Sequence, residues 1–229
     1  MPLWRQGMQM TVKIVNVFDG NLNIDLPNHL ALINLFDSNT GAASCVMDGT
    51  YITGIRTAAS AVLSARMLSR SGSRIAPVIG AGVQGREHVR LLPLIRDFER
   101  INVCSLRFED AQKLAAQIEI AGATTDVEAA VRESDVVCLA AHSPTPVIRP
   151  EWVRRGTHVS SVGYYPPDGE LPKDLARASP VCRDARRFSA DSGWLRRTRG
   201  PGSLRGNDSR SSGSRSEGRP PQRCRDHRT

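Results

Sequence analysis

The sequence predicts an α/β fold: a doubly wound parallel sheet, preceded by a smaller antiparallel region and followed by a disordered, arginine-rich tail. Three observations carry this prediction. A glycine-rich segment, Gly80-x-Gly82-x-x-Gly85, separates a short apolar run from a helix-compatible stretch. Strand-like and helix-like segments alternate between about residues 70 and 180. Before residue 50, three β-rich segments follow one another with no helix between them.

The N-terminal region, residues 1–69, is expected to hold an antiparallel meander and one long helix. Residues 10–18, 30–36 and 43–47 are β-rich runs separated by polar turn clusters. Apolar residues then recur at roughly helical spacing from about residue 50 to residue 69. Arg56 and Thr57 fall in the first half of this predicted helix.

The glycine-rich segment predicts a dinucleotide-binding turn. It follows the apolar run 74–79 and opens a predicted helix over 83–95, which is the strand–turn–helix setting that this fingerprint requires. Gly80 permits the turn, Gly82 lets a pyrophosphate approach the backbone, and Gly85 lets the helix pack on the strand. The anion would lie at the positive end of the helix.

Pro77 favours the alternative, an ordinary glycine turn, because a proline removes a hydrogen-bond donor from the expected central strand. The segments that follow favour a Rossmann-type parallel sheet, which we place at residues 70–181. The nearly continuous apolar run 135–140 is typical of a strand buried on both faces. The other expected elements are strands at 101–105 and 157–163, a third strand ending near residue 125, and helices at 109–120 and 127–132.

The second strand of this sheet bears on the choice of cofactor. In NAD-binding domains an acidic residue about 20 positions beyond the glycine turn binds the ribose 2′-hydroxyl. Ser105 occupies that position here, and Arg107 lies close by. Without the carboxylate, and with a guanidinium near it, a 2′-phosphate is accepted. The sequence therefore favours NADP(H) over NAD(H).

The formal net charge of +8 is concentrated in the tail, residues 182–229. Residues 183–229 contain 13 arginines, no lysine and 5 acidic residues, so the rest of the chain is balanced. A segment of this composition cannot bury enough apolar surface to fold. A basic arm that binds nucleic acid is one interpretation. The sequence favours the other, a GC-rich gene translated out of frame, and a nucleic-acid partner is not expected.

The body of the chain has the features of a cytoplasmic protein. Its five cysteines are scattered, which favours reduced thiols, and no Cys or His spacing indicates metal ligands. No apolar run is long enough to span a bilayer, and the N-terminus has no secretory signal. We therefore expect neither a metal nor a membrane partner.

Several blocks occur in a consistent order over about residues 8–181. They are Val12-Lys13-Ile14-Val15-Asn16-Val17-Phe18, Leu26-Pro27-Asn28-His29, Leu35-Phe36-Asp37-x-x-x-Gly41, Asp48-Gly49-Thr50-x-x-Thr53-x-x-Arg56-Thr57-Ala58-Ala59, Gly80-Ala81-Gly82-Val83-Gln84, Pro146-Val147-Ile148 and Val162-Gly163. Together they resemble the ornithine cyclodeaminase/mu-crystallin family. The resemblance implies a nucleotide domain beside a substrate and dimerisation domain, a homodimer, and a small amino or imino acid as substrate.

The resemblance also implies roles for single residues. Lys13 resembles the lysine that contacts the substrate carboxylate, although an exposed strand lysine is the plainer interpretation. Arg56 resembles the arginine that bridges this carboxylate and the cofactor. The predicted cofactor-binding residues are Asn28, Arg56, Thr57, Gly80, Gly82, Val83, Gln84, Gly85, Ser105, Arg107, Val162 and Gly163.

One departure from the family concerns the catalytic acid. The cyclodeaminase pattern has an aspartate where this chain has Tyr165, and Asp168 could replace it only in a remodelled loop. A tyrosine is not an ionised base near neutral pH without a large shift of its pKa. The sequence therefore favours hydride transfer between nicotinamide and an imino or amino acid, with Lys13 and Arg56 holding the carboxylate. A lyase that converts ornithine to proline and ammonia, and a non-catalytic NADPH-binding protein or inactive fragment, are the alternatives.

The chain also departs from the family at both ends. It begins almost at the strand that carries Lys13, and the arginine-rich tail replaces the segment that returns to the substrate domain. We therefore expect residues 1–69 to be a partial substrate/dimerisation region, in a truncated and frame-shifted product.

Overall fold

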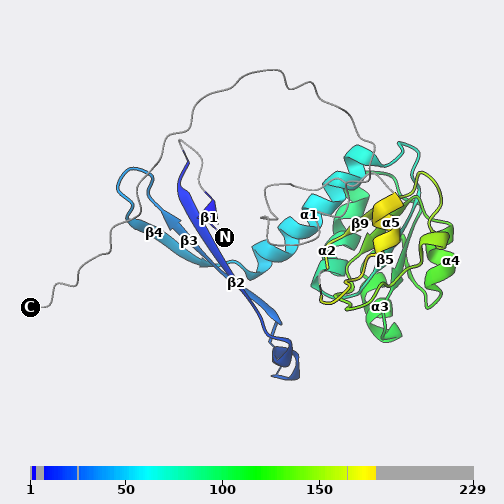
Figure 1. Cartoon of the computed structure of the whole chain (residues 1–229), viewed down its shortest axis with the longest axis horizontal. Coiled ribbons are helices and arrows are strands. Elements are labelled where there is room, and N and C mark those ends of the chain that lie inside the picture. The colour runs from blue at the N-terminus through cyan, green and yellow to red at the C-terminus, as the bar shows by residue number, and fades with distance from the viewer. Residues whose placement is uncertain (1, 4–7, 25, 164, 179–229) are drawn as a thin grey trace, which may run out of the picture. The chain divides into compact units, whose positions relative to one another are not determined.

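The computed structural model describes residues 2–3, 8–24, 26–163 and 165–178 (Figure 1). These residues form a four-stranded antiparallel sheet, a five-stranded parallel sheet and the helices that accompany them. The predicted α/β fold, with a doubly wound parallel sheet and a smaller antiparallel region, is therefore confirmed. The tail predicted for 182–229 lies outside the described residues, and the domain boundaries proposed above stay predictions.

The antiparallel sheet contains one strand more than the predicted meander. Its order is β1-β2-β3-β4. The additional strand, β1, is two residues long, which is too short for any periodicity to reveal it. The strands are β1 (Pro2–Leu3), β2 (Met10–Val17), β3 (His29–Phe36) and β4 (Ala43–Asp48), with the 3-10 helix η1 (Asp19–Ile24) between β2 and β3.

The two faces of this sheet have different environments. Lys13 pairs with Ile33, and opposite residues of an antiparallel pair lie on the same face. Ile33 is buried, and a β-carbon at Gly49 would lie only 2.7 Å from its Cγ1, so this face packs closely on the start of the next helix. On the other face, Ile14 and Leu32 are 49% and 42% exposed. The face that carries Lys13 is thus covered at Ala31 and Ile33, although Val15 and Val17 remain exposed on it. The other face is open at Ile14 and Leu32.

The parallel sheet has the order β7-β6-β5-β8-β9, with β5 in the centre. Pro77 lies within β5 and pairs with Asn102 of β6. The described ladder between β5 and β8 includes only Val78 and Ile79 of β5, so it begins immediately after the proline. The central strand therefore accommodates the missing donor at its less paired end. The strands are β5 (Ile75–Ile79), β6 (Arg100–Cys104), β7 (Ala121–Ala123), β8 (Val136–Leu139) and β9 (His158–Ser161).

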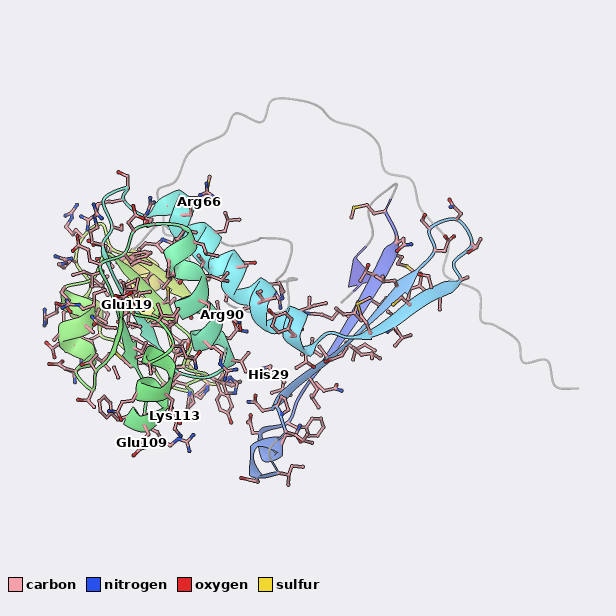
Figure 2. The ribbon with its side chains drawn as sticks, turned by 180° about the vertical axis from the view of Figure 1, so that it is seen from behind. His29, Arg66, Arg90, Glu109, Lys113 and Glu119 are labelled. Carbon is pink, nitrogen blue, oxygen red and sulfur yellow. The ribbon has the colours of Figure 1, made fainter. Side chains whose placement is uncertain are left out.

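Helices cover both faces of the parallel sheet, as a doubly wound fold requires. One buried cluster joins the sheet to α1, α2 and α3, and a second joins its opposite face to α4, η3 and α5. Charged side chains such as Arg66, Arg90 and Lys113 lie on the exposed sides of the first three helices (Figure 2). The helices are α1 (Thr50–Leu68), α2 (Val83–Leu91), η2 (Leu92–Leu94), α3 (Phe108–Ala115), α4 (Val127–Arg132), η3 (Pro150–Trp152) and α5 (Lys173–Ala178).

Several elements end earlier than the sequence predicted. The helix expected to reach residue 95 ends at Leu91, because Pro93 lacks the N–H group that would continue it. The helix expected to reach residue 120 ends at Ala115, and Ile118 and Ile120 then pack against the core from a turn. Strand β7 ends at Ala123, just before the threonines that were expected to close it.

A carboxylate fastens the amino-terminal end of the parallel sheet. Asp135, just before β8, accepts hydrogen bonds from the backbone N–H groups of Arg74 (2.8 Å) and Ile75 (3.3 Å) at the start of β5. It also pairs with the guanidinium groups of Arg70 (3.0 Å) and Arg154 (3.6 Å). Burial alone would raise the pKa of this carboxyl, but the two N–H groups and the two arginines together hold the pKa below its ordinary value.

We expect the substitution Asp135→Asn to lower the free energy of unfolding by about 1–2 kcal/mol, because an amide replaces a charged acceptor that joins two strands. Thermal and urea unfolding measure this change. The control is Asp174→Asn, which removes a carboxylate that is 81% exposed and paired with the exposed Arg177, and which should change stability by less than about 0.5 kcal/mol. Equal stability of the two variants would contradict a structural role for Asp135.

Candidate dinucleotide and substrate site

The turn after β5 has the geometry of a dinucleotide-binding loop. Gly80 has a φ of +117°, and a β-carbon there would lie 2.2 Å from the carbonyl oxygen of Ala140, so only glycine fits. A β-carbon at Gly85 would lie 1.8 Å from the carbonyl oxygen of Gly80. Both glycines are therefore required by close packing within the protein.

Gly82 has a different environment from its two neighbours. A β-carbon at Gly82 would meet no atom within 4 Å, and the residue begins α2 without any side-chain cap. The first N–H groups of a helix have no partner within it, and they attract anions. In the first turn of α2, Oε1 of Gln84 is buried with no hydrogen-bond partner in the described part of the chain. An open approach and a buried acceptor without a donor fit a bound dinucleotide.

Helix α1 brings the predicted substrate residues to this loop. Nζ of Lys13 donates a hydrogen bond to Oγ1 of Thr53 (3.3 Å) on the first turn of α1. One residue later, a β-carbon at Gly54 would lie 3.1 Å from Cγ1 of Val83, so α1 crosses α2 at its first residue. Lys13, the first half of α1 and the glycine turn are thus contiguous.

Arg56 and Thr57, predicted from the sequence, lie on α1 within one turn of this crossing. Both are partly buried, and Oγ1 of Thr57 donates to the carbonyl oxygen of Thr53 (2.8 Å). The structure therefore brings the predicted carboxylate-binding residues and the glycine turn together through one helix.

The second strand places the two residues predicted to select the cofactor. Ser105 directly follows β6, and Arg107 is the N-cap residue of α3. The side chain of Arg107 is 78% exposed, and its guanidinium contacts Asp110 at 2.6 and 2.7 Å. This ion pair places a carboxylate beside the guanidinium that is expected to bind a 2′-phosphate.

A cluster of polar and aromatic side chains surrounds His142, in the loop after β8. His142 has a φ of +48°, which is rare for a residue other than glycine. Its ring meets those of Tyr165 and His29 edge to face at centroid distances of 4.8 and 5.6 Å. Asp19 lies 3.7 Å from its Nε2 and accepts a 3.4 Å hydrogen bond from Asn28. The predicted residue Asn28 therefore belongs to a network that the sequence did not indicate.

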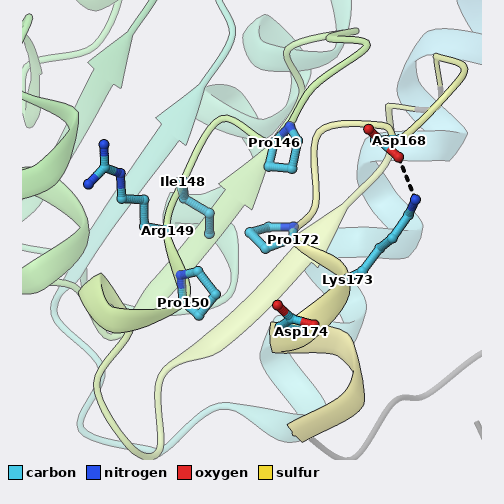
Figure 3. A pocket seen from close by; sticks show the side chains of 8 residues that line it. All are labelled: Pro146, Ile148, Arg149, Pro150, Asp168, Pro172, Lys173 and Asp174. Atoms are coloured by element: carbon cyan, nitrogen blue, oxygen red, sulfur yellow. Dashed lines mark hydrogen bonds and ion pairs between the residues drawn. The ribbon is translucent and has the colours of Figure 1, made fainter.

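Asp168, the residue considered as a replacement for the missing acid, points elsewhere. Its carboxylate forms an ion pair with Lys173. Both residues line a pocket together with Pro146 and Pro172 (Figure 3). Tyr165 instead contacts His142. The loop thus separates Asp168 from the position that Tyr165 occupies.

Val162 and Gly163, the last predicted cofactor residues, follow β9. The backbone N–H of Val162 donates to the carbonyl oxygen of Leu139 (3.2 Å), which continues the pairing of β9 with β8. Gly163 donates to the carboxylate of Glu170 (2.7 Å), and a β-carbon at Gly163 would lie 2.5 Å from this carboxylate. Contact with Glu170 therefore explains why this position is glycine.

The chain aligns with the model of the ornithine cyclodeaminase/mu-crystallin family over residues 1–200. The chain belongs to this family. It is 32% identical over 179 residues to the ketimine reductase mu-crystallin of Mus musculus, which covers 77% of this chain and 57% of the mouse protein.

Solved structures of the family have the same architecture. The Δ1-pyrroline-2-carboxylate reductase of Thermococcus litoralis, in complex with NADH and L-proline, matches with a TM-score of 0.70 and 35% identity, over 75% of this chain and 55% of that one. A lysine cyclodeaminase matches with a TM-score of 0.70 and 26% identity, over 77% and 54% of the two chains. The chain thus spans little more than half the length of these relatives.

Two classes of site have no candidate in the described part of the chain. No group of three or more His, Cys, Asp or Glu side chains there could hold a metal ion. None of the helices described above combines the length and the apolar character needed to cross a bilayer.

His88 is a buried titratable residue of α2, three residues beyond Gly85 of the glycine turn. Its ring is fully buried, and Nδ1 lies 2.7 Å from the carbonyl oxygen of Gln84. Burial lowers the pKa of His88 below 6.5, and the Gln84 carbonyl and the Glu170 carboxylate only partly oppose this effect. The folded chain therefore keeps this imidazole neutral at a pH where the unfolded chain would protonate it.

We expect stability to fall as the pH is lowered from 7.5 to 5.5, because below pH 6.5 the unfolded state takes up a proton that folded His88 does not. The loss from His88 is at most about 1.4 kcal/mol over this interval. Urea unfolding of His88→Gln and of the unsubstituted chain at several pH values measures it. The variant should show a smaller slope, and the slope that remains includes His158 and His29, whose pKa values burial also lowers. An unchanged slope would contradict the assignment to His88.

Proposed function

We propose that the protein is a nicotinamide-dependent reductase of small imino acids, able to oxidise the matching amino acids in the reverse direction. The observation that carries this proposal is the contiguity of Lys13, α1 and the glycine turn through the Lys13–Thr53 and Gly54–Val83 contacts. A cationic group beside a dinucleotide loop suits a substrate that is a carboxylate and reacts with hydride. The names of the mouse and Thermococcus litoralis relatives support this reaction class.

The described residues would bind and orient the reactants. The N–H groups at the start of α2 would hold the pyrophosphate, and Gln84 would accept a hydrogen bond from the cofactor. Lys13 and Arg56 would hold the substrate carboxylate, with Thr53 keeping Lys13 in place. The bound nicotinamide would supply or accept the hydride. Fixing the carboxylate orients the imine carbon, and such orientation lowers the barrier for hydride transfer.

A lyase acting on ornithine or a related diamine is the second candidate, and the similarity to a lysine cyclodeaminase supports it. That family pattern has an aspartate where this chain has Tyr165. Because Asp168 pairs with Lys173 and Tyr165 contacts His142, the described residues offer no carboxylate in that place. This arrangement favours reduction over ammonia elimination. A dinucleotide-binding protein without turnover is the third candidate.

We further propose that NADP(H) is preferred over NAD(H), that the protein is cytoplasmic, and that two copies associate through the open face of the antiparallel sheet. Arg107 beside Ser105 supports the first point, since a guanidinium attracts a 2′-phosphate. Support for association comes from a row of exposed apolar side chains on that face, which would be covered in a dimer. They are Ile14, Leu30, Leu32 and Val46.

We expect Gly82→Ala to weaken dinucleotide binding about tenfold or more, because the new methyl group would occupy the space through which the pyrophosphate approaches. The substitution should change the stability of the unliganded protein by less than about 1 kcal/mol, since the site is open and its φ of −76° is unstrained. Gly72→Ala is the control, because a β-carbon there also meets open space.

Thermal unfolding with NADPH and with NADH measures this binding. A dinucleotide at 100 times its Kd should raise the midpoint by about 5–10 °C, with the larger shift for NADPH at equal concentration. No shift of the unsubstituted chain with either dinucleotide would contradict the proposed function, and a larger shift with NADH would contradict the cofactor preference.

We expect Lys13→Gln to lower kcat/KM for Δ1-pyrroline-2-carboxylate about 100-fold, because the substrate carboxylate loses a charged partner, and to leave the NADPH affinity unchanged. The absorbance of NADPH measures turnover, and Lys113→Gln, an exposed lysine of α3, is the control. Ammonia release from ornithine with no net change in NAD(P)H would instead select the lyase.

A further inference from the structure

Glu170 is a fully buried carboxylate that no part of the proposed reaction uses. It lies in the segment between β9 and α5 and is 0% exposed. Oε1 accepts hydrogen bonds from the backbone N–H of Gly163 (2.7 Å) and from Oγ of Ser161 (2.8 Å). Oε2 accepts one from the backbone N–H of Ala141 (2.6 Å). A buried carboxylate is costly unless it is satisfied in this way.

These donors come from two separate segments, one after β8 and one at the end of β9. Ala141 follows β8, and Ser161 and Gly163 lie at the end of β9 and directly after it. The backbone of Glu170 joins the same loops, because its carbonyl oxygen accepts a hydrogen bond from the N–H of Val147 (3.0 Å). Glu170 therefore fastens the carboxyl-terminal ends of β8 and β9 to each other.

The position of these loops relates them to the reacting end of the cofactor. In a doubly wound sheet the ligand binds at the carboxyl ends of the strands, where the strand order reverses. In the order β7-β6-β5-β8-β9 this point lies between β5 and β8, and there Gly80 packs on the carbonyl of Ala140. A dinucleotide bound in this way would have its 2′-group near the end of β6, and its nicotinamide half would then extend toward the ends of β8 and β9.

We propose that Glu170 is a positioning residue, which sets the loops at Ala141 and Gly163 so that the nicotinamide ring and the substrate meet in a reactive geometry. This inference rests on the proposed function. Glu170 would act through the backbone, since its side chain is fully buried. The loops that it holds also carry His142 and Tyr165, one and two residues beyond its backbone donors. The affinity for the dinucleotide, by contrast, would depend mainly on the glycine turn.

The close contact at Gly163 supports a geometric role. A β-carbon at this residue would lie 2.5 Å from Oε2 and 2.9 Å from Oε1 of Glu170. The carboxylate thus lies directly against the backbone, with no space for a water molecule between them. A displacement of Glu170 would therefore move the loop itself.

Glu170→Gln in the full chain tests this proposal. The amide keeps the shape of the side chain, but its NH2 group would face a backbone N–H donor where a carboxylate oxygen now accepts it. We expect NADPH to bind within about threefold of the unsubstituted affinity and kcat for Δ1-pyrroline-2-carboxylate to fall on the order of 10- to 100-fold, as for a misplaced reactant. The emission of bound NADPH should shift toward that of NADPH in water, because its nicotinamide ring would be less firmly held.

The matched control is Asp135→Asn, which removes the corresponding carboxylate from the opposite end of the same sheet. It should lower the unfolding midpoint and leave kcat and the NADPH emission unchanged. Unchanged kcat and emission in Glu170→Gln, or equal losses in both variants, would overturn the positioning role. If Glu170→Gln does not fold, Ser161→Ala removes one of the three donors, and an unchanged kcat and emission in that variant would overturn it too.

The same measurements separate this inference from the proposed function. If the unsubstituted chain binds no dinucleotide, the proposed function fails and the positioning role falls with it. If it binds NADPH but reduces no imino acid, the emission of the bound nicotinamide in the variants decides the positioning role alone.

Discussion

The site depends on one region of close backbone packing, where Gly85 lies against the carbonyl of Gly80 and Gly80 lies against the carbonyl of Ala140. Separations of 1.8 and 2.2 Å to hypothetical β-carbons mean that no other residue type fits at either glycine. This packing joins β5, α2 and the loop after β8 at the point where the strand order reverses. Because these two glycines pack within the protein, the open space beside Gly82 is left for a ligand.

Two carboxylates hold the ends of the parallel sheet in register. Asp135 joins β5 and β8 at the amino-terminal end, and Glu170 joins β8 and β9 at the carboxyl-terminal end. Asp135 accepts the N–H groups of two consecutive residues at the start of β5, and Glu170 accepts N–H groups from the segments after β8 and β9. Each carboxylate thus satisfies backbone donors where neighbouring strands diverge. Asp135 also pairs with the exposed arginines Arg70 and Arg154, whereas Glu170 is fully buried. We therefore expect Asp135 to act mainly on stability and, as proposed above, Glu170 on the geometry of the loops.

The chain belongs to the ornithine cyclodeaminase/mu-crystallin family, and this membership relates the glycine turn and Lys13 to a dinucleotide and a carboxylate substrate. The chain spans 54–57% of the relatives compared above, and its described part contains the nucleotide-binding sheet and the meander that carries Lys13. Helix α1 joins the two, because its first turn contacts Lys13 and its next residues cross α2. A substrate carboxylate held near Lys13 would therefore lie near a dinucleotide held at Gly82.

The sequence alone determined the fold class, the glycine turn and the blocks that resemble the family, because these depend on local periodicity and on residues close together in the chain. It also predicted the residues that α1 and the glycine turn bring together. It did not predict the hydrogen bonds of Glu170, the ring contacts of His142 or the ion pair between Asp168 and Lys173. Each of these depends on partners from separate loops, or on which way a side chain turns, and no periodicity records such contacts. Only the tertiary structure decided them, because a buried carboxylate is identified by its donors, and the donors of Glu170 at Ala141, Ser161 and Gly163 are brought together by the pairing of β8 with β9.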